Sequence, residues 1–120
     1  KGHAAYDLVS LLQDARRDIP AALEGHLYAH YCEAREAGDS SFDREAYSCC
    51  YAALGAQRNC KILGIFARLA KRDRKRAYLA HIPHVSQYLE RDLAHPALEE
   101  LRAWFAVHLP ADLRAKPLAI

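Results

Sequence analysis

The sequence predicts an all-α fold. The chain of 120 residues has only five glycines and five prolines, while alanine, leucine and arginine, which favour helices, are abundant. Residues 43–73 contain no proline, and their apolar side chains recur at steps of three and four, the spacing of one helical face. No segment shows the strict alternation of a half-buried strand. We therefore expect about five helices around one long central helix.

The first helix is expected over residues 4–17. Its apolar side chains cover more than half of its circumference, which predicts a mostly buried helix: Leu8, Val9, Leu11, Leu12 and Ala15. The remaining polar strip consists of Asp7, Ser10, Asp14 and Arg17. Two interpretations are open. The strip is either a solvated edge with an Asp14–Arg17 ion pair or a surface that faces a functional cleft.

A second helix should begin at Pro20, which suits the first helical position, and end at Gly38. Its inner face is expected to consist of Leu23, Leu27, Tyr28 and Tyr31. His26 and His30 lie four residues apart, but no third ligand has a supporting spacing, so we expect surface histidines and no metal site.

The central helix is expected from Asp43 to Asp73, with Asp43 as its N-cap. Gly55 and Gly64 lie within it, although glycine weakens a helix by about 1 kcal/mol relative to alanine. Close approach of another helix would explain both glycines.

Arg58 interrupts the apolar stripe of the central helix, with Gln57 and Asn59 beside it. An arginine on an apolar face needs a carboxylate, a phosphate or a polar cleft, because burying it unpaired is costly. Two hypotheses remain open here. Arg58 either binds a ligand or forms an internal ion pair with Asp14 or Asp7.

Residues 68–76 read RLAKRDRKR, with six basic residues in nine. The run has no interleaved aromatic residues and no Gly-rich RNA-binding signature, and cations at a helix C-terminus complement its dipole. A solvated turn is therefore favoured over contact with nucleic acid or acidic lipid.

The fourth helix, over residues 75–93, must kink or restart at Pro83. A last helix from Pro96 to His108 should pack through Leu98, Leu101, Trp104, Phe105 and Leu109. These helices complete one helical domain, residues 1–110. We expect a weakly structured C-terminal tail, residues 111–120.

Composition and motifs exclude several classes of protein. The net charge of +2 is too small to indicate a nucleic-acid binder, and no apolar run is long enough for a membrane span. The four cysteines have no ligand spacing, so we expect unpaired thiols and a cytoplasmic location. The sequence shows no Gly-rich phosphate loop, no nucleophile elbow and no zinc spacing.

Three stretches, HAAYDLVSLLQDARRDIP, GAQRNCKILGIFARLAKRD and YLERDLAHPALEELRAWF, resemble the C-terminal helical lobe of the aminoglycoside phosphotransferase and choline kinase superfamily. Within it, they are most similar to bacterial amino-sugar kinases of cell-wall (peptidoglycan) recycling. The similarity covers residues 2 to about 109. One departure is RDRKRAY, which stands where a turn containing Gly-Pro is expected.

The resemblance implies a fragment of an ATP- and magnesium-dependent transferase that phosphorylates an amino-sugar hydroxyl. The nucleotide lobe, the catalytic loop and the magnesium motif would precede this chain, which should be inactive alone. The helical lobe supplies the acceptor pocket in this superfamily, and the residues expected there are Arg58, Asn59, Gln57, Asp14 and Arg17. Asp7 resembles the acid that braces the catalytic loop.

An alternative function is a stand-alone helical interaction module whose basic turn binds nucleic acid or an acidic partner. The two hypotheses differ in the surface that they predict. A kinase lobe should expose an apolar face where the nucleotide lobe packs, and through that face the isolated chain could form a homodimer.

Overall fold

The structure is a computed structural model that describes residues 2–116. This range contains six α-helices, two short 3₁₀ helices and no strand, which confirms the all-α prediction. In chain order the elements are α1 (Ala4–Leu12), α2 (Ala21–Gly38), α3 (Arg44–Arg72), η1 (Arg76–His81), α4 (Ile82–Leu93), η2 (Pro96–Leu98), α5 (Glu99–His108) and α6 (Ala111–Ala115).

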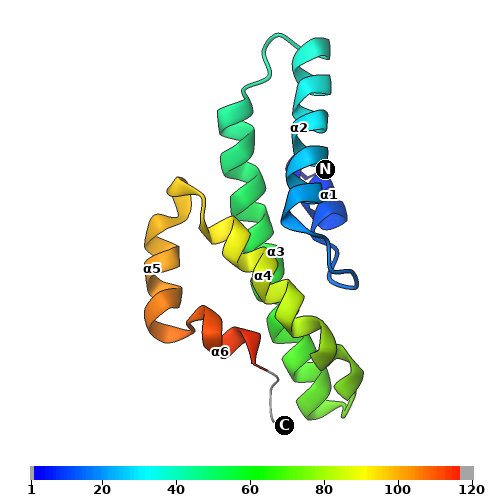
Figure 1. Cartoon of the computed structure of the whole chain (residues 1–120), viewed down its shortest axis with the longest axis vertical. Helices are drawn as coiled ribbons and strands as arrows, with labels where there is room; N and C mark the ends of the chain where they lie inside the picture. Colours follow the sequence, from blue (N-terminus) through cyan, green and yellow to red (C-terminus); the bar gives the residue numbers. More distant parts are fainter. Residues whose placement is uncertain (1, 117–120) are drawn as a thin grey trace.

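Helix α3 is the axis of the molecule (Figure 1). Its 29 residues correspond to a length of about 43 Å, most of the 51 Å long dimension of the chain. Helices α2 and α3 form an antiparallel hairpin, and α4 packs along α3. Helices α1 and α2 lie on one side of α3, and α5 and α6 lie on the other (Figure 1). The predicted central helix is confirmed.

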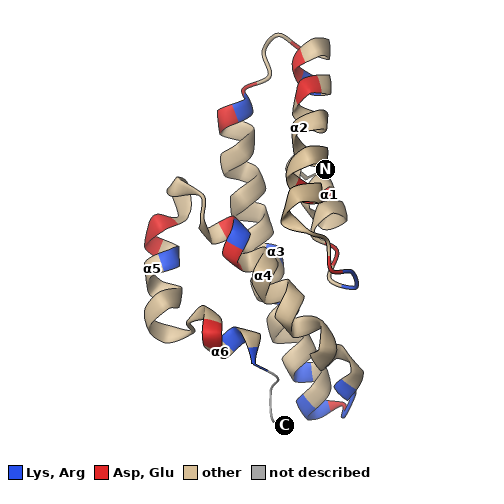
Figure 2. Cartoon of the chain, viewed as in Figure 1, with Lys and Arg blue, Asp and Glu red and all other residues tan. Residues whose placement is uncertain are grey.

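Both ends of α3 follow from local chemistry. The Asp43 carboxylate accepts hydrogen bonds from the backbone N–H groups of Glu45 and Ala46, each at 3.1 Å, which confirms the predicted N-cap. After the last turn, Arg74 has a φ of 58°, a left-handed conformation that favours glycine. Residues 71–78 are all exposed, and the Lys and Arg residues of the run lie at this end of α3 (Figure 2). The end of the basic run is therefore exposed to solvent, and the absence of a nucleic-acid or lipid contact there stays a prediction.

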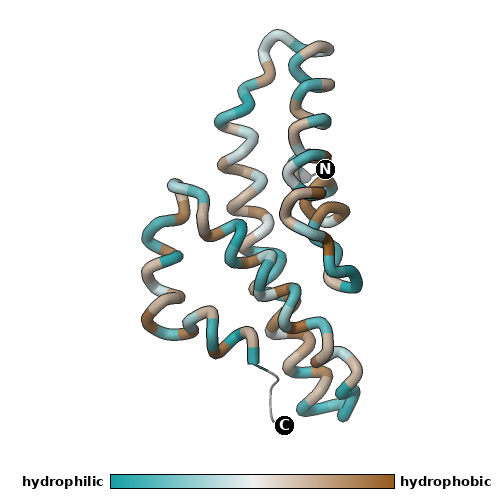
Figure 3. Tube along the Cα trace, in the orientation of Figure 1, coloured by the Kyte–Doolittle hydropathy of each residue, from teal (hydrophilic) through white to brown (hydrophobic). Residues whose placement is uncertain are grey.

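The core consists of three apolar clusters, and α3 contributes to each of them. Between α1, α2 and α3 the buried residues are Ala5, Val9, Leu12, Cys32, Tyr47 and Tyr51. Further along, Phe66 packs with Ala15, Ile82 and Val85. A third cluster joins Ala56, Leu89, Leu93 and Phe105. Apolar and polar residues mix along every helix (Figure 3), and no helix within residues 2–116 has the length and hydropathy to cross a membrane.

Helix α1 ends at Leu12, and the prediction that it continues to residue 17 is wrong. The Asp14 carboxylate accepts the backbone N–H of Arg16 at 2.9 Å, a local turn that competes with helical hydrogen bonds. Asp14 and Arg17 therefore do not continue the polar strip that begins at Asp7. The prediction of a mostly buried helix also fails at Leu11, which is 67% exposed.

Several predicted inward-facing residues are exposed. In α2 the side chains of Leu23 and Leu27 point outward, while Glu24 and Cys32 are buried. In α5 only Phe105 is buried, and Trp104 is 52% exposed. The other predicted packing residues that are exposed are Leu101 and Leu109.

The expected weakly structured tail contains helix α6. Arg114 anchors α6 to α4, with only 5% of its surface exposed. Its guanidinium donates hydrogen bonds to the Ser86 hydroxyl at 3.1 Å and the Leu109 carbonyl at 2.9 Å, and forms an ion pair with Glu90. The prediction is therefore wrong for residues 111–115, and residues 117–120 lie outside the described range.

The two glycines inside α3 have different environments. A Cβ atom at Gly55 would lie 2.6 to 2.7 Å from the carboxyl atoms of Asp92 on α4, so close helix approach explains this glycine. A Cβ atom at Gly64 would have no neighbour within 4 Å, so the same explanation is wrong there.

We predict that Gly55→Ala lowers the free energy of unfolding by about 1–3 kcal/mol, because the added methyl group displaces a buried carboxyl group. Gly64→Ala is the matched control and should raise the free energy of unfolding by about 0.5–1 kcal/mol, because alanine has the higher helix propensity. Urea denaturation of both variants measures the difference. Equal effects would contradict the close contact at Gly55.

We also predict that Arg74→Gly raises the free energy of unfolding by about 0.5–1 kcal/mol, because glycine adopts the left-handed conformation without steric cost. Lys75→Gly is the control, since Lys75 has a φ of −86° and gains nothing from glycine. Urea denaturation again provides the measurement, and a loss of stability in Arg74→Gly would show that the conformation is not strained.

Candidate functional site

A buried polar network joins four segments of the chain next to α3. Gln13 and Asn59 are fully buried and Asp92 is 3% exposed. The Gln13 Nε2 donates to Asp92 Oδ1 at 2.8 Å and to Glu24 Oε2 at 2.7 Å. The Asn59 Nδ2 donates to Gln13 Oε1 at 2.8 Å and to Asp92 Oδ2 at 2.9 Å. One amide side chain thus bridges two carboxyl groups.

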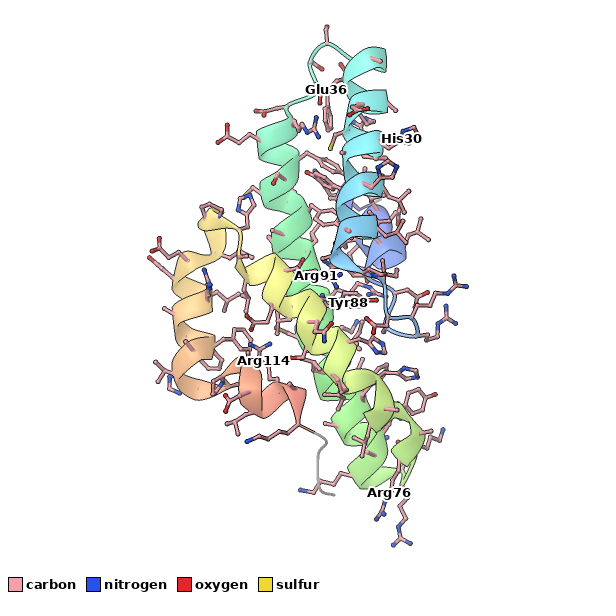
Figure 4. All side chains as sticks on the ribbon, in the orientation of Figure 1. His30, Glu36, Arg76, Tyr88, Arg91 and Arg114 are labelled. Carbon is pink, nitrogen blue, oxygen red and sulfur yellow. The ribbon has the colours of Figure 1, made fainter. Side chains whose placement is uncertain are left out.

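A second layer of contacts surrounds Glu24. The Tyr51 hydroxyl donates to Glu24 Oε2 at 2.6 Å, and Arg91 donates to Glu24 Oε1 at 3.1 Å. The same Arg91 nitrogen donates to the carbonyl of Ile19 at 2.8 Å. Tyr88 accepts the backbone N–H of Ile19 at 2.9 Å. Figure 4 labels Tyr88 and Arg91 on α4, and their contacts hold the loop between α1 and α2.

Burial sets the charge of this network. It raises the pKa of Asp92 to about 7, although the hydrogen bonds from Gln13 and Asn59 oppose the shift. The nearby negative charge of Glu24 adds to the increase, and Arg91 reduces it. Burial and the contact with Glu24 also raise the pKa of the Tyr51 hydroxyl. Asp92 is therefore a carboxyl group that takes up a proton near neutral pH.

A cavity of about 340 Å³ opens beside the network, between α2, α3 and α4. Its volume falls in the range of small-molecule sites. Small residues leave the space open: Ala21, Gly25 and Ala52. Polar and aromatic groups line the rest: Gln13, Glu24, Tyr28, Ser48, Tyr51, Arg91, Asp92 and His95. We call this space the α2–α4 cavity.

Ser48, His95 and Asp92 line the same cavity but do not form a nucleophilic triad. The His95 Nδ1 accepts the backbone N–H of Ala97 at 3.1 Å, at the start of η2. In neutral His95 the proton must therefore lie on Nε2, which is 3.1 Å from the Ser48 hydroxyl oxygen and donates to it. Since Nε2 cannot accept the proton of Ser48 in this tautomer, the pair does not activate a serine nucleophile.

Two of the five predicted substrate-binding residues belong to the network. Asn59 is fully buried and holds Gln13 and Asp92. Arg58 donates to the backbone carbonyl of Gln13 at 3.2 Å. The hypothesis of an ion pair between Arg58 and Asp14 or Asp7 is wrong, because the contact that the structure gives is this carbonyl.

The other predicted residues lie apart from the cavity. Gln57, Arg17 and Asp7 are exposed, so Asp7 does not face the interior of the described chain. Asp14 is half-buried, and its ion pair is with Arg16, at 3.5 Å, and not with Arg17. The residues that line the α2–α4 cavity include none of the five, and the substrate-binding role of each stays a prediction.

Sequence analysis missed the two carboxylates at the centre of the site. Asp92 follows Val85 and Leu89 at steps of four and three, so an acidic residue interrupts the apolar stripe of α4 as Arg58 interrupts that of α3. Glu24 precedes Tyr28 and Cys32 at steps of four. The signal was present in the spacing.

Within residues 2–116, no group of three or more His, Cys, Asp or Glu side chains could hold a metal ion. All four cysteines are free thiols, and only Cys32 is buried. His26 and His30 are exposed on α2, as predicted.

Comparison with known proteins relates the chain to a segment of bacterial kinases, although no family model matches it. The relatives carry the name N-acetylmuramate/N-acetylglucosamine kinase. The protein from Caulobacter vibrioides is 44% identical over 93% of this chain, and that from Pseudomonas putida is 35% identical over 95%. The protein from Neisseria meningitidis serogroup B is 43% identical over 75%.

The chain spans about a third of the length of these curated relatives, between 28% and 34% of each. The resemblance to amino-sugar kinases is therefore confirmed for a segment of those proteins. The wider superfamily stays a prediction.

We predict that Asp92 makes the chain less stable as the pH rises from about 4 to about 7. In this interval the Asp92 carboxyl group is protonated in the folded state and ionised in the unfolded state, so unfolding releases a proton. A rise in pH favours that release and therefore favours unfolding. Asp92 contributes at most about 1.4 kcal/mol per pH unit to the slope of the free energy of unfolding against pH. Asp92→Asn should remove this contribution. Urea denaturation at several pH values between pH 5 and pH 7.5 would measure the change.

Asp39→Asn is the control for this experiment. The pKa of the exposed Asp39 is lowered by hydrogen bonds from Ser41, so Asp39 stays ionised throughout the same pH interval. Its variant should keep the slope of the unchanged chain. Parallel stability curves for the unchanged chain and Asp92→Asn would contradict protonation of Asp92 in the folded state.

Proposed function

We propose that this chain is the helical, acceptor-binding part of an amino-sugar kinase. The observation that carries the proposal is the 44% identity to the Caulobacter vibrioides protein over 93% of the chain. The intact enzyme would transfer the γ-phosphoryl group of ATP, with magnesium, to a hydroxyl of N-acetylmuramate or N-acetylglucosamine in peptidoglycan recycling in the cytoplasm. Both sugars carry an N-acetyl group.

The exposed apolar side chains of α1 and α2 support a missing neighbour. Tyr6 and Leu11 are exposed on α1, and Leu23 and Leu27 are exposed on α2. A nucleotide lobe that packs against these helices would bury them. In its absence, the same side chains would favour the homodimer that the sequence suggests.

ATP and magnesium are assigned to that lobe. Phosphoryl transfer needs metal-bridged phosphates and a positioned base, and within residues 2–116 no acidic cluster could hold a metal. On this proposal the chain alone is inactive. The exposed carboxylate of Asp7 on α1 would be available to brace the catalytic loop of the missing lobe.

The alternative function, an interaction module that binds nucleic acid or an acidic partner, has less support. The match to the Caulobacter vibrioides kinase covers 112 of the 120 residues, so it includes the basic turn. The turn needs no partner, because its residues are solvated and Arg72 pairs with Asp73 at 3.1 Å.

We predict that a chimera restores kinase activity to this chain. The matching 112 residues of the Caulobacter vibrioides protein would be replaced by the corresponding residues of this chain. The chimera should phosphorylate N-acetylglucosamine when ATP and magnesium are supplied, while the 120-residue chain alone should not. Release of ADP that depends on the amino sugar is the measurement.

The control is a folded chimera that carries Gly64→Ala, a change that touches no neighbour and should keep the activity. A chimera with native-like stability but no amino-sugar kinase activity would contradict the proposal. Activity of the chain alone would contradict the assignment of ATP and magnesium to another lobe.

A further inference from the structure

The acidic groups beside the α2–α4 cavity are already engaged in the buried network. Glu24 accepts three hydrogen bonds, from Gln13, Tyr51 and Arg91. Each carboxyl oxygen of Asp92 accepts one, from Gln13 and Asn59. The amide hydrogens of Gln13 and Asn59 are consumed in the same contacts. Of the buried polar atoms in this network, only Asn59 Oδ1 has no hydrogen-bond partner among the described residues, and Asn59 does not line the cavity. The network therefore leaves few acceptors for a ligand.

Ser48 presents a hydroxyl donor to the cavity. Its oxygen accepts the Nε2 proton of His95, whose tautomer is fixed by the backbone N–H of Ala97. Many helical serines donate to the carbonyl four residues earlier, as Ser10 does to Tyr6 at 2.7 Å. Ser48 makes no such bond within the described residues, and its hydroxyl lies close enough to the Tyr28 hydroxyl to oppose the rise that burial causes in the pKa of Tyr28. A ligand that accepts the Ser48 proton would replace this contact.

Tyr28 and Arg91 supply further donors on the cavity wall. The Tyr28 hydroxyl is buried and has no hydrogen-bond partner among the described residues. A buried hydroxyl without a partner costs free energy, and a ligand that accepts from it would remove that cost. Arg91 uses one terminal nitrogen for Glu24 and Ile19, and its Nε and second terminal nitrogen have no hydrogen-bond partner among the described residues.

The charges around the cavity favour a neutral group of the ligand at this point. Arg91 already pairs with Glu24 at 3.1 Å, and Asp92 lies next to both. An anionic group would approach the Glu24 carboxylate at the cost of like-charge repulsion, while a cationic group would meet Arg91 and the donor hydroxyls of Ser48 and Tyr28. An uncharged group with a strong acceptor, such as an amide carbonyl, fits the donors and avoids both costs.

We propose that the α2–α4 cavity binds the N-acetyl group of an amino sugar, with the Tyr28 and Ser48 hydroxyls donating to its carbonyl oxygen. His95 acts as a positioning residue, because it orients the Ser48 hydroxyl. Gly25 and Ala52 leave room for the methyl group. This inference rests on the proposed function and adds to it the residues that distinguish N-acetylated sugars from plain hexoses.

The test is a titration of the full chain, followed by NMR, with N-acetylglucosamine, glucosamine and glucose. The three sugars differ only at carbon 2, which carries an acetamido, an ammonium or a hydroxyl group. N-acetylglucosamine should bind most tightly and should shift the signals of residues around the cavity. Absence of binding, or equal binding of all three sugars, would overturn the inference.

Matched variants make the test specific. Tyr28→Phe removes the hydroxyl but keeps the aromatic ring, whose centroid lies 4.8 Å from the centroid of the Tyr51 ring. Ser48→Ala removes the second donor. Each should weaken binding of N-acetylglucosamine roughly two- to tenfold. Tyr78→Phe and Ser10→Ala are the controls outside the cavity and should not change it.

The two proposals fail in distinguishable ways. If N-acetylglucosamine binds the chain but Tyr28→Phe and Ser48→Ala behave like their controls, the cavity assignment is wrong and the kinase proposal stands. If the chimera shows no amino-sugar kinase activity, the proposed function fails whatever the titration shows.

Discussion

The burial of the Asp92 carboxyl group against Gly55 is the constraint on which the rest of the structure depends. Helix α4 packs along α3 so that the Asp92 carboxyl group lies over Gly55, which has no side chain. A Cβ atom at Gly55 would lie within 2.7 Å of that carboxyl group. A buried carboxyl group without partners is costly, so the chain must deliver donors to this point. Asn59 comes from α3 itself, and Gln13 comes from the end of α1. The contact between the two main helices thus requires a particular conformation of a third segment.

That requirement explains the short first helix and the loop that follows it. Gln13 leaves the helical path with a φ of −125° and is fully buried. Arg58 holds the Gln13 carbonyl, while Tyr88 and Arg91 hold the backbone at Ile19. The loop between α1 and α2 is therefore fixed by side chains of α3 and α4. Helix α2 then begins where Glu24 can reach the free proton of the Gln13 amide, and the α2–α4 cavity is the space that remains.

Sequence patterns predicted the parts of the fold that local chemistry decides. The bounds of α3 follow from its periodicity and from the Asp43 cap, and the restart at Pro83 follows from the missing N–H of proline. The end of α1 could not be predicted in this way, because glutamine suits a helix. Gln13 leaves the helix to donate a hydrogen bond to Asp92, which lies 79 residues further along the chain. Leu23 and Leu27 point outward for the same reason, because Glu24 occupies the inward face of α2 and accepts a hydrogen bond from Gln13. Of the site residues, Arg58 and Asn59 could be identified from the broken stripe, while their role in holding Gln13 depends on contacts between distant segments.

The network also determines what the neighbouring cavity can recognise. A carboxylate in a ligand site usually acts as an acceptor, and two of them beside a cavity suggest a site for hydroxyl or ammonium donors. Here both carboxyl groups face donors that belong to the protein, and the Asp92 pKa of about 7 shows how strongly burial acts on one of them. The groups left for a ligand are therefore hydroxyl and guanidinium donors. A buried polar network whose carboxyl groups are occupied by donors of the protein changes the adjoining cavity from an acceptor-rich to a donor-rich site. For this reason the types of the lining residues alone would suggest the wrong ligand chemistry.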